Sequence, residues 1–304
     1  MFGQSRKNIV PMLKYAPIMC GIMSEENSTR VLAIHDISCF GRCSLTVALP
    51  IVSAAGLECT ILPNSMLSTH TAIKGFTYHD LTSDMVPIAD HWKQVGLRFG
   101  TIYTGYLCNK EQVDIVCGIV DDFGKDAFIF VDPAMADNGS LYPLFGPEFP
   151  GEIARLCAKA DVIKPNITEA CLLTGTEYRH GPYTEEWIGE LVGKLRKICD
   201  GKIILTGVHY DDKRIGAIAV DSDGSTEFCS ADFVPQMYHG SGDVFSAAAV
   251  GALGCGFSLK DATQIAVDFT EEAVRRTYES GADIRFGVDF EKCFPSYLRA
   301  LGKL

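Results

Sequence analysis

Residues 30–36 read Arg-Val-Leu-Ala-Ile-His-Asp, an apolar run between polar ends. A short apolar run bounded by polar sequence is typical of a strand buried within a sheet. Five further runs of this kind follow, and stretches with the spacing of amphipathic helices lie between them. The core strands are predicted at 31–35, 59–63, 101–104, 127–131, 162–164 and 202–206. Such alternation indicates an α/β fold with a mostly parallel central sheet.

The sequence beyond residue 213 shows a different pattern. Residues 214–220 and 225–229 flank the tetrapeptide Asp-Ser-Asp-Gly, and Asp-Gly is a frequent hairpin turn, so we expect an antiparallel hairpin at one edge of the sheet. A chain of 304 residues is near the upper limit for one compact domain, and residues 30–304 are predicted to form a single domain. Residues 1–29 are interpreted as an N-terminal extension, and whether it is flexible is left open.

Composition restricts the kinds of ligand that the chain can recognise. Its formal net charge of −11 and pI near 5.1 oppose association with nucleic acids and with anionic membrane surfaces. No apolar run approaches the length of about 20 residues that a membrane-spanning helix needs. The 12 cysteines are scattered without a CxxC pair, which favours reduced thiols in a cytoplasmic protein. We therefore expect small-molecule ligands, with no nucleic acid and no membrane.

The most informative stretch is Gly-Ser-Gly-Asp at 240–243, which leads directly into a helix-forming run. Glycines allow backbone amides to approach a ligand, and the N-terminus of a helix attracts phosphate. In that arrangement Asp243 would accept the proton of a substrate hydroxyl as the hydroxyl oxygen attacks a γ-phosphorus. The amides of Ser241, Gly242 and Asp243 would neutralise the charge on the phosphoryl group. The alternative is an ordinary N-cap, since serine, glycine and aspartate are all common at helix starts.

Two further predicted strand ends carry oxygen ligands. Asp132 follows one apolar run, and Asn166 and Glu169 lie three residues apart after another. Mg²⁺ prefers oxygen ligands and retains several waters, so Asp132 and Glu169 are interpreted as holding it through water while it bridges nucleotide phosphates. Asn166 with Glu169 also fits a capping box, which is the rival interpretation. P-loop kinases and protein kinases are disfavoured, because the chain has no GxxxxGK[ST] sequence and no combined HRD and DFG set.

The ordered motifs resemble those of the ribokinase-like superfamily and, within it, the pyridoxal kinase family, from about Val31 to about Gly256. Besides GSGD and NxxE, the shared elements are Ala33-Ile34, Phe40-Gly41, Asn64-Ser65, Ser68-Thr69-His70-Thr71, Thr104-Gly105-Tyr106-Leu107 and Asp132-Pro133-Ala134-Met135. The resemblance implies a ribokinase-like three-layer α/β/α fold and, in the usual case, a homodimer. It also implies transfer of the ATP γ-phosphate, with Mg²⁺, to the 5′-hydroxymethyl group of a vitamin B6 vitamer in pyridoxal 5′-phosphate salvage. A requirement for a monovalent cation is left open.

Carried over residue by residue, the resemblance implies three groups of site residues. The catalytic group consists of the base and its anion hole: Asp243, Gly240, Ser241 and Gly242. The nucleotide-binding group lies around the Mg-nucleotide, at a strand end and beside adenine: Asp132, Asn166, Glu169, Thr206, Gly207, Phe233 and Val234. The substrate-binding group holds the vitamer: Asp36, His70, Thr71, Tyr106 and Asp243. Tyr106 is expected to pack on the pyridine ring, and Asp132 and Glu169 are the expected metal ligands.

Two residues depart from the better-known members of the family. Asp36 stands where those proteins have serine, and Leu67 stands where their lid has phenylalanine. An ionised aspartate only accepts hydrogen bonds and adds a negative charge. Our hypothesis is that Asp36 favours a cationic vitamer such as pyridoxamine, by pairing with its ammonium group or with a protonated ring nitrogen.

Other functions remain open. Hydroxymethylpyrimidine and hydroxymethylpyrimidine-phosphate kinases share the GxGD and NxxE pattern, and residues 68–71 with 104–106 favour the B6 assignment without deciding it. A non-catalytic B6-binding protein on a kinase scaffold is a second alternative, and the intact Asp243 argues against it. A sugar kinase of the same superfamily is less favoured, because the usual N-terminal sugar-binding pattern is not found.

Overall fold

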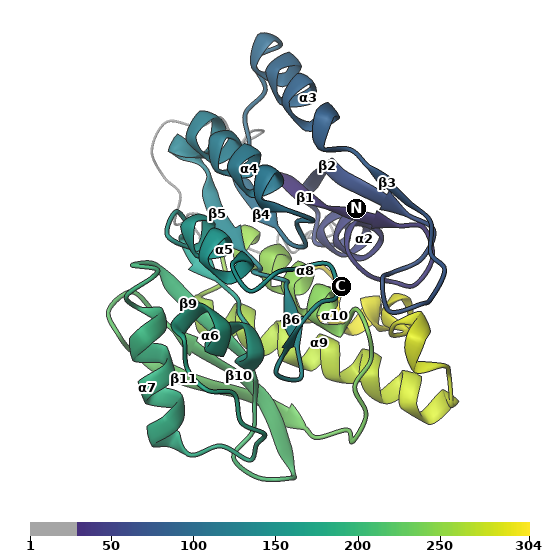
Figure 1. The fold of residues 1–304 in the computed structure, drawn as a ribbon. Helices are drawn as coiled ribbons and strands as arrows, with labels where there is room; N and C mark the ends of the chain where they lie inside the picture. The colour runs from purple at the N-terminus through teal and green to yellow at the C-terminus, as the bar shows by residue number, and fades with distance from the viewer. Residues whose placement is uncertain (1–28) are drawn as a thin grey trace, which may run out of the picture.

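The centre of the molecule is a nine-stranded sheet (Figure 1). The structure, a computed structural model, describes residues 29–304, so the extension predicted at 1–29 lies outside the described residues except for Thr29. Across the sheet the strand order is β11-β10-β9-β8-β5-β4-β1-β2-β3. The strands are β1 (Arg30–Ser38), β2 (Glu58–Leu67), β3 (Tyr78–Asp80), β4 (Thr101–Thr104), β5 (Phe128–Val131), β8 (Val162–Ile163), β9 (Lys202–Val208), β10 (Arg214–Val220) and β11 (Thr226–Asp232). A separate ribbon pairs β6 (Ala136–Asp137) with β7 (Ser140–Leu141).

The sheet is mostly parallel, as the sequence predicts. The neighbouring pairs from β9 through β8, β5, β4 and β1 to β2 are parallel. The edge pairs β9/β10, β10/β11 and β2/β3 are antiparallel. Each predicted core strand is present, and the hairpin occurs as β10 and β11. The prediction missed β3, whose residues are all exposed and therefore carry no apolar signal.

Helices cover both faces of the sheet (Figure 1). One face carries α3 (Thr82–Gln94), α4 (Lys110–Phe123), α5 (Phe149–Cys157), α6 (Ile167–Thr174) and α7 (Glu185–Leu195). The other face carries α2 (Leu45–Ala54), α8 (Ser241–Gly254), α9 (Leu259–Ser280) and α10 (Phe294–Ala300). Short 3₁₀ turns are η1 (Gly124–Asp126), η2 (Ile284–Phe286) and η3 (Phe290–Cys293).

Alternate residues of β1 divide the apolar core into two layers. Leu32 and Ile34 belong to the cluster beneath α3 to α7, whereas Val31 and Ala33 belong to the cluster beneath α2, α8 and α9. Successive side chains of a strand point to opposite faces of the sheet, so a fully apolar strand must be covered on both sides. The burial pattern of β1 therefore produces the three-layer α/β/α arrangement, and the predicted fold class is confirmed.

Two expectations from composition concern the whole chain. Among residues 29–304, no helix is both long and apolar enough to cross a membrane. The cysteines in that range are free, and most of them are buried.

Candidate active site

A cavity of about 570 Å³ opens where β1, β5, β8 and β9 end and α8 begins. The predicted site residues that line it are Asp36, His70, Thr71, Tyr106, Asp132, Asn166, Glu169, Thr206, Gly207, Val234, Gly240, Ser241, Gly242 and Asp243. Leu67, the second departure from the family pattern, lines it too. Phe233 is the exception, because its ring stacks on His209 and it is not part of the lining. The structure thus brings the predicted residues together, apart from Phe233, whose place beside adenine stays a prediction.

The first turn of α8 lies against the loop that follows β1. Gly240 is the N-cap with φ of 79°, a left-handed conformation that favours glycine. A Cβ at this position would also collide with the carbonyl oxygen of Arg42. The Val244 N–H donates to Gly240 O at 3.0 Å, so the amides of Gly242 and Asp243 precede the hydrogen-bond ladder of the helix. A helix start with such unsatisfied donors forms one wall of the cavity, where an anion is favoured.

Asp243 lies in this first turn and is partly open to the cavity. Desolvation and the neighbouring Asp132 raise the pKa of the Asp243 carboxyl to about 7, although a backbone hydrogen bond from Ser44 and the charge of Lys164 lower it. A carboxylate whose pKa lies near neutral pH is matched to the task of a general base. The position and the pKa of Asp243 therefore both suit proton abstraction.

The loop at 41–44 holds Asp243 through the backbone of Ser44. Gly41, Arg42 and Ser44 have positive φ values of 124°, 45° and 55°. For residues other than glycine such conformations cost about 1–3 kcal/mol each, so the surrounding structure must hold them in place. Arg42 forms ion pairs with Asp289 at 2.7 Å and with Glu291 at 2.9 Å. The segment between α9 and α10, which contains Asp289 and Glu291, thus supports a strained loop that contacts the candidate base.

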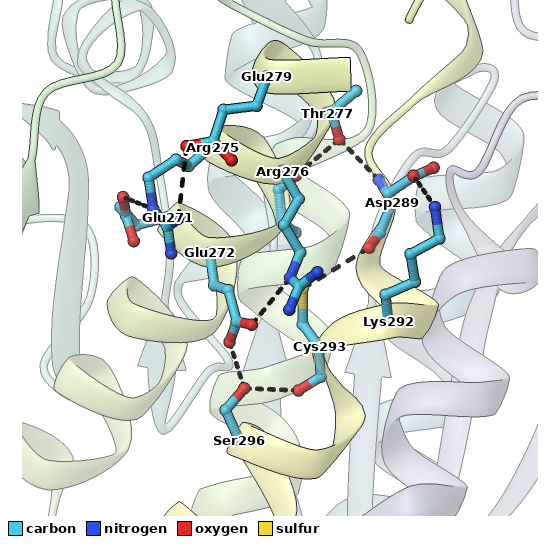
Figure 2. A network of polar contacts seen from close by, with 11 residues as sticks. Glu271, Glu272, Arg275, Arg276, Thr277, Glu279, Asp289, Lys292, Cys293 and Ser296 are labelled. Carbon is cyan, nitrogen blue, oxygen red and sulfur yellow. Dashed lines mark hydrogen bonds and ion pairs between the residues drawn. The ribbon is translucent and has the colours of Figure 1, made fainter.

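Figure 2 shows how this segment and the start of α10 are attached to α9. The N–H of Asp289 donates to Thr277 Oγ1 at 2.8 Å, and Lys292 pairs with the Asp289 carboxylate at 2.7 Å. Glu272 on α9 accepts a hydrogen bond from Ser296 at the start of α10. Because Asp289 also binds the arginine of the loop, the network links α9 to the candidate site.

Asp132 lies directly after β5 and is buried. Its Oδ2 lies 2.7 Å from Lys164 Nζ and accepts a hydrogen bond from Ser246 at 2.7 Å. Its Oδ1 is buried and has no partner among residues 29–304. Within the same range no group of three or more His, Cys, Asp or Glu side chains forms a ready metal site. One free carboxylate oxygen fits a Mg²⁺ that keeps most of its ligands as water.

Asn166 and Glu169 form the capping box that is the rival interpretation of their spacing. Asn166 Oδ1 accepts from the Glu169 N–H at 2.8 Å, and Glu169 Oε2 accepts from the Asn166 N–H at 2.8 Å. Glu169 Oε1 accepts from the Met135 N–H at 3.1 Å. Desolvation and Asp132 raise the pKa of Glu169. Both carboxylate oxygens already bind backbone amides, and a further contact with metal-bound water stays a prediction.

Asp36, near the end of β1, also lines the cavity. Asp36 is buried and accepts a hydrogen bond from Ser38 Oγ at 3.1 Å. Desolvation raises the pKa of Asp36, although hydrogen bonds from Ser44 and Ser38 oppose the shift. His70 stacks on His239 with ring centroids 3.7 Å apart, and its Nε2 lies 2.5 Å from the carbonyl oxygen of Arg285.

Tyr106 also lines the cavity and belongs to an aromatic group. Its ring centroid lies 5.4 Å from that of Phe145 and 6.4 Å from that of Tyr142. The Tyr106 hydroxyl is buried and has no partner among the described residues. An unpartnered buried hydroxyl is costly, and it is therefore available to a polar group of a ligand.

The charged residues of the cavity that sequence reasoning missed include Lys164 and Asp137. Asp137 accepts hydrogen bonds from Tyr142 at 3.0 Å and from Asn166 Nδ2 at 3.2 Å. Lys164 directly follows β8, and Asp137 is the last residue of β6, the strand that comes after β5 in the chain. The rule that ligands gather at strand ends identifies both positions when it is applied to every polar residue there.

Comparisons with known proteins agree with this geometry. The family model for phosphomethylpyrimidine kinase matches residues 68–286. A crystal structure from Bacteroides thetaiotaomicron, described as a phosphomethylpyrimidine kinase and determined with pyridoxal, is 35% identical, with a TM-score of 0.84, and the match covers 88% of this chain and 95% of that one. Pyridoxal kinase from Lactobacillus plantarum is 29% identical with a TM-score of 0.82, and the match covers 89% and 97% of the two chains.

A curated relative carries the other substrate name. Hydroxymethylpyrimidine/phosphomethylpyrimidine kinase of Bacillus subtilis is 27% identical over 61% of this chain and 67% of its own length. The fold is thus that of an α/β small-molecule kinase. The chain belongs to the phosphomethylpyrimidine kinase family, within the ribokinase-like group that includes pyridoxal kinases, and the resemblance drawn from its motifs is confirmed.

Proposed function

We propose that the protein transfers the γ-phosphate of ATP to the 5′-hydroxymethyl group of a vitamin B6 vitamer. The observation that carries this proposal is a single cavity lined both by the start of α8 with Asp243 and by Asp36, His70 and Tyr106. The Bacteroides thetaiotaomicron relative, which is 35% identical, was crystallised with pyridoxal and supports the choice of vitamer. Family membership implies ATP as the donor.

The residues of the cavity divide the work of the proposed reaction. Asp243 takes the proton of the vitamer hydroxyl, and the amides at the start of α8 receive the charge of the phosphoryl group. Thr206 and Gly207 at the end of β9, with Val234 in the lining, border the space for the rest of the nucleotide. Asp132, through its free Oδ1, and Glu169, through water, would hold Mg²⁺, which supplies a Lewis acid for the phosphate oxygens.

The second candidate function is phosphorylation of hydroxymethylpyrimidine or its phosphate. The family description and the Bacillus subtilis relative favour it. Both reactions would use the same base and the same phosphate site. The alternatives therefore differ in the residues that would contact the ring of the acceptor. Homodimer formation, a cytoplasmic location and a monovalent cation requirement stay predictions.

The experiment that tests the proposal is ADP production by the purified protein with ATP and Mg²⁺. Pyridoxal, pyridoxamine, pyridoxine and hydroxymethylpyrimidine are compared as acceptors, with Asp243→Ala as the inactive control. Turnover of a B6 vitamer supports the proposal, and selective turnover of the pyrimidine supports the second candidate. Thermal stabilisation by a vitamer without any ADP production would instead indicate a non-catalytic B6-binding protein.

A further inference from the structure

Lys164 is a buried lysine in the wall of the cavity. Its backbone N–H donates to Val131 O at 2.9 Å, which fixes the residue at the end of the parallel strands. Its side chain is 5% exposed and that of Asp132, its partner at 2.7 Å, is 3% exposed. A buried ion pair loses hydration that mutual attraction often fails to offset, so stability alone explains it poorly. A charge retained at this cost beside a cavity is a candidate for ligand binding.

The charges around Lys164 are acidic. Besides Asp132, its charge acts on the carboxyl groups of Glu169, Asp137 and Asp243. Among the described residues that line the cavity, Lys164 is the only lysine or arginine. A nucleotide triphosphate brings several negative charges into this acidic site, and Lys164 is the side chain placed to compensate them.

The ammonium group of Lys164 also has donors to spare. It carries three N–H groups, and Asp132 is its only acceptor among residues 29–304. Its Nζ lies 3.7 Å from the position that a Cβ on Gly242 would occupy. Two N–H donors of the ammonium group and the amides at the start of α8 therefore border the same space.

We propose that Lys164 binds the terminal phosphate of ATP and stabilises the phosphoryl group during its transfer, an inference that rests on the proposed kinase function. In this step the acceptor hydroxyl oxygen forms a bond to the γ-phosphorus, and the bond from that phosphorus to the β,γ-bridging oxygen breaks. ADP leaves with the electron pair of the broken bond, and the hydroxyl proton passes to Asp243. Lys164 stays protonated, and its free N–H groups contact the oxygens of the group in transfer.

The simpler explanation is that Lys164 only neutralises Asp132. A counter-ion of this kind affects the stability of the fold but does not distinguish a triphosphate from a diphosphate. A residue that contacts the terminal phosphate weakens binding of the triphosphate alone when it is removed. The ratio of the two affinities therefore separates the explanations.

The test is isothermal titration calorimetry of Lys164→Met with ADP and with the β,γ-imido analogue of ATP. Excess EDTA is present, so that the ratio reports side chains of the protein. Loss of a charged hydrogen bond predicts analogue binding that is weaker by about 10- to 100-fold and ADP binding that changes by less than about threefold. Lys202→Met is the matched control, because Lys202 pairs with Asp221 at 3.1 Å and does not line the cavity.

A second pair of variants covers the loss of the counter-ion. Lys164→Met leaves Asp132 buried without its partner, whereas the double variant Asp132→Asn, Lys164→Met carries neither charge. Compared with Asp132→Asn alone, the double variant should show the same selective loss of analogue binding. An unchanged affinity ratio in this comparison, or equal loss for both nucleotides, would overturn the inference. Wild-type protein that binds neither nucleotide, with or without magnesium, contradicts the proposed function itself.

Discussion

The residues proposed to bind phosphate and those proposed to bind the vitamer, which we call the phosphate end and the vitamer end of the cavity, differ in how the fold holds them. At the phosphate end, Asp132 and Lys164 follow β5 and β8 directly, and Asp243 lies in the first turn of α8. At the vitamer end, His70 comes from the segment after β2 and contacts Arg285, which is 215 residues away in the sequence. The first group therefore depends on strand ends and one helix, whereas the second combines Asp36 and Tyr106, near the ends of β1 and β4, with a loop held over a long sequence distance.

This difference agrees with the function proposed for each group of residues. Phosphoryl transfer requires charges held in fixed positions, and strand ends and helix starts provide them. Loops can vary without disturbing the sheet, and they are where related enzymes change their substrates. We therefore expect changes at the phosphate end to alter turnover, and changes at the vitamer end to alter the choice of acceptor.

The largest expected effect is at the phosphate end. Asp243→Asn keeps the shape of the side chain and removes the base, so kcat should fall by about 10²- to 10⁴-fold. The KM for ATP should stay within about threefold, because the amides of α8 remain in place. Asp261→Asn, in the first turn of α9, is the matched control and should leave kcat unchanged. A decrease in kcat smaller than tenfold would remove Asp243 from the role of base.

The pH dependence of kcat/KM gives the next largest effect. Asp243 acts as a base only when it is ionised, and its pKa is raised to about 7 by desolvation, Asp132 and Asp36, against Ser44 and Lys164. Below that pH the ionised fraction falls about tenfold per pH unit, so kcat/KM should fall with it and should level off above. The profile is measured with pyridoxal and with pyridoxine. A decrease in kcat/KM that occurs at the same pH with both acceptors is assigned to a group of the protein. A value of kcat/KM that stays constant down to pH 5 would contradict the assignment.

A smaller effect is expected at the vitamer end. Asp36→Ser replaces a buried negative charge by a neutral hydroxyl, so the preference for pyridoxamine over pyridoxal should fall by about tenfold. Asp36 contributes to the raised pKa of Asp243, so the turnover number with pyridoxal is compared well above that pKa, where it should change little. The measurement is the ratio of the kcat/KM values for the two vitamers in wild type and variant. An unchanged ratio would show that Asp36 does not distinguish acceptors by their charge.

The smallest effect is expected for Arg42, which supports the loop that contacts Asp243. Arg42→Met removes the ion pairs to Asp289 and Glu291 and loosens the loop that positions Asp243. We expect a decrease in kcat of about threefold to tenfold, since small displacements of reacting groups slow catalysis. Arg155→Met, which removes exposed ion pairs on α5, is the control and should not change kcat. Equal effects of the two variants would show that the loop does not depend on Arg42.

The sequence predicts many residues that line the cavity, for a physical reason. Strand ends and helix starts follow from local patterns, and Gly240 to Asp243, Asp132 and Glu169 all lie at such positions. The core strands are predicted because burial on both faces requires apolar runs. The strand-end rule also identifies the position of Lys164, but its burial and its pairing with Asp132 depend on contacts between distant segments, which no local pattern reports.

Contacts over long sequence distances account for most of the remainder. The support of Arg42 by Asp289 and of His70 by Arg285 joins segments more than 200 residues apart, and a single sequence carries no signal for either pairing. The capping box of Asn166 and Glu169 was recognised as an alternative, and the structure contains it. Spacing alone does not decide between a cap and a metal ligand, because both use the same carboxylate.

The most direct test of the account is phosphorus NMR of the products formed from ATP, Mg²⁺ and a B6 vitamer. We expect ADP and the 5′-phosphate ester of the vitamer to appear in equal amounts, and both to form about 10²- to 10⁴-fold more slowly with Asp243→Asn. Formation of ADP with inorganic phosphate and no ester, or full activity of the variant, would contradict it.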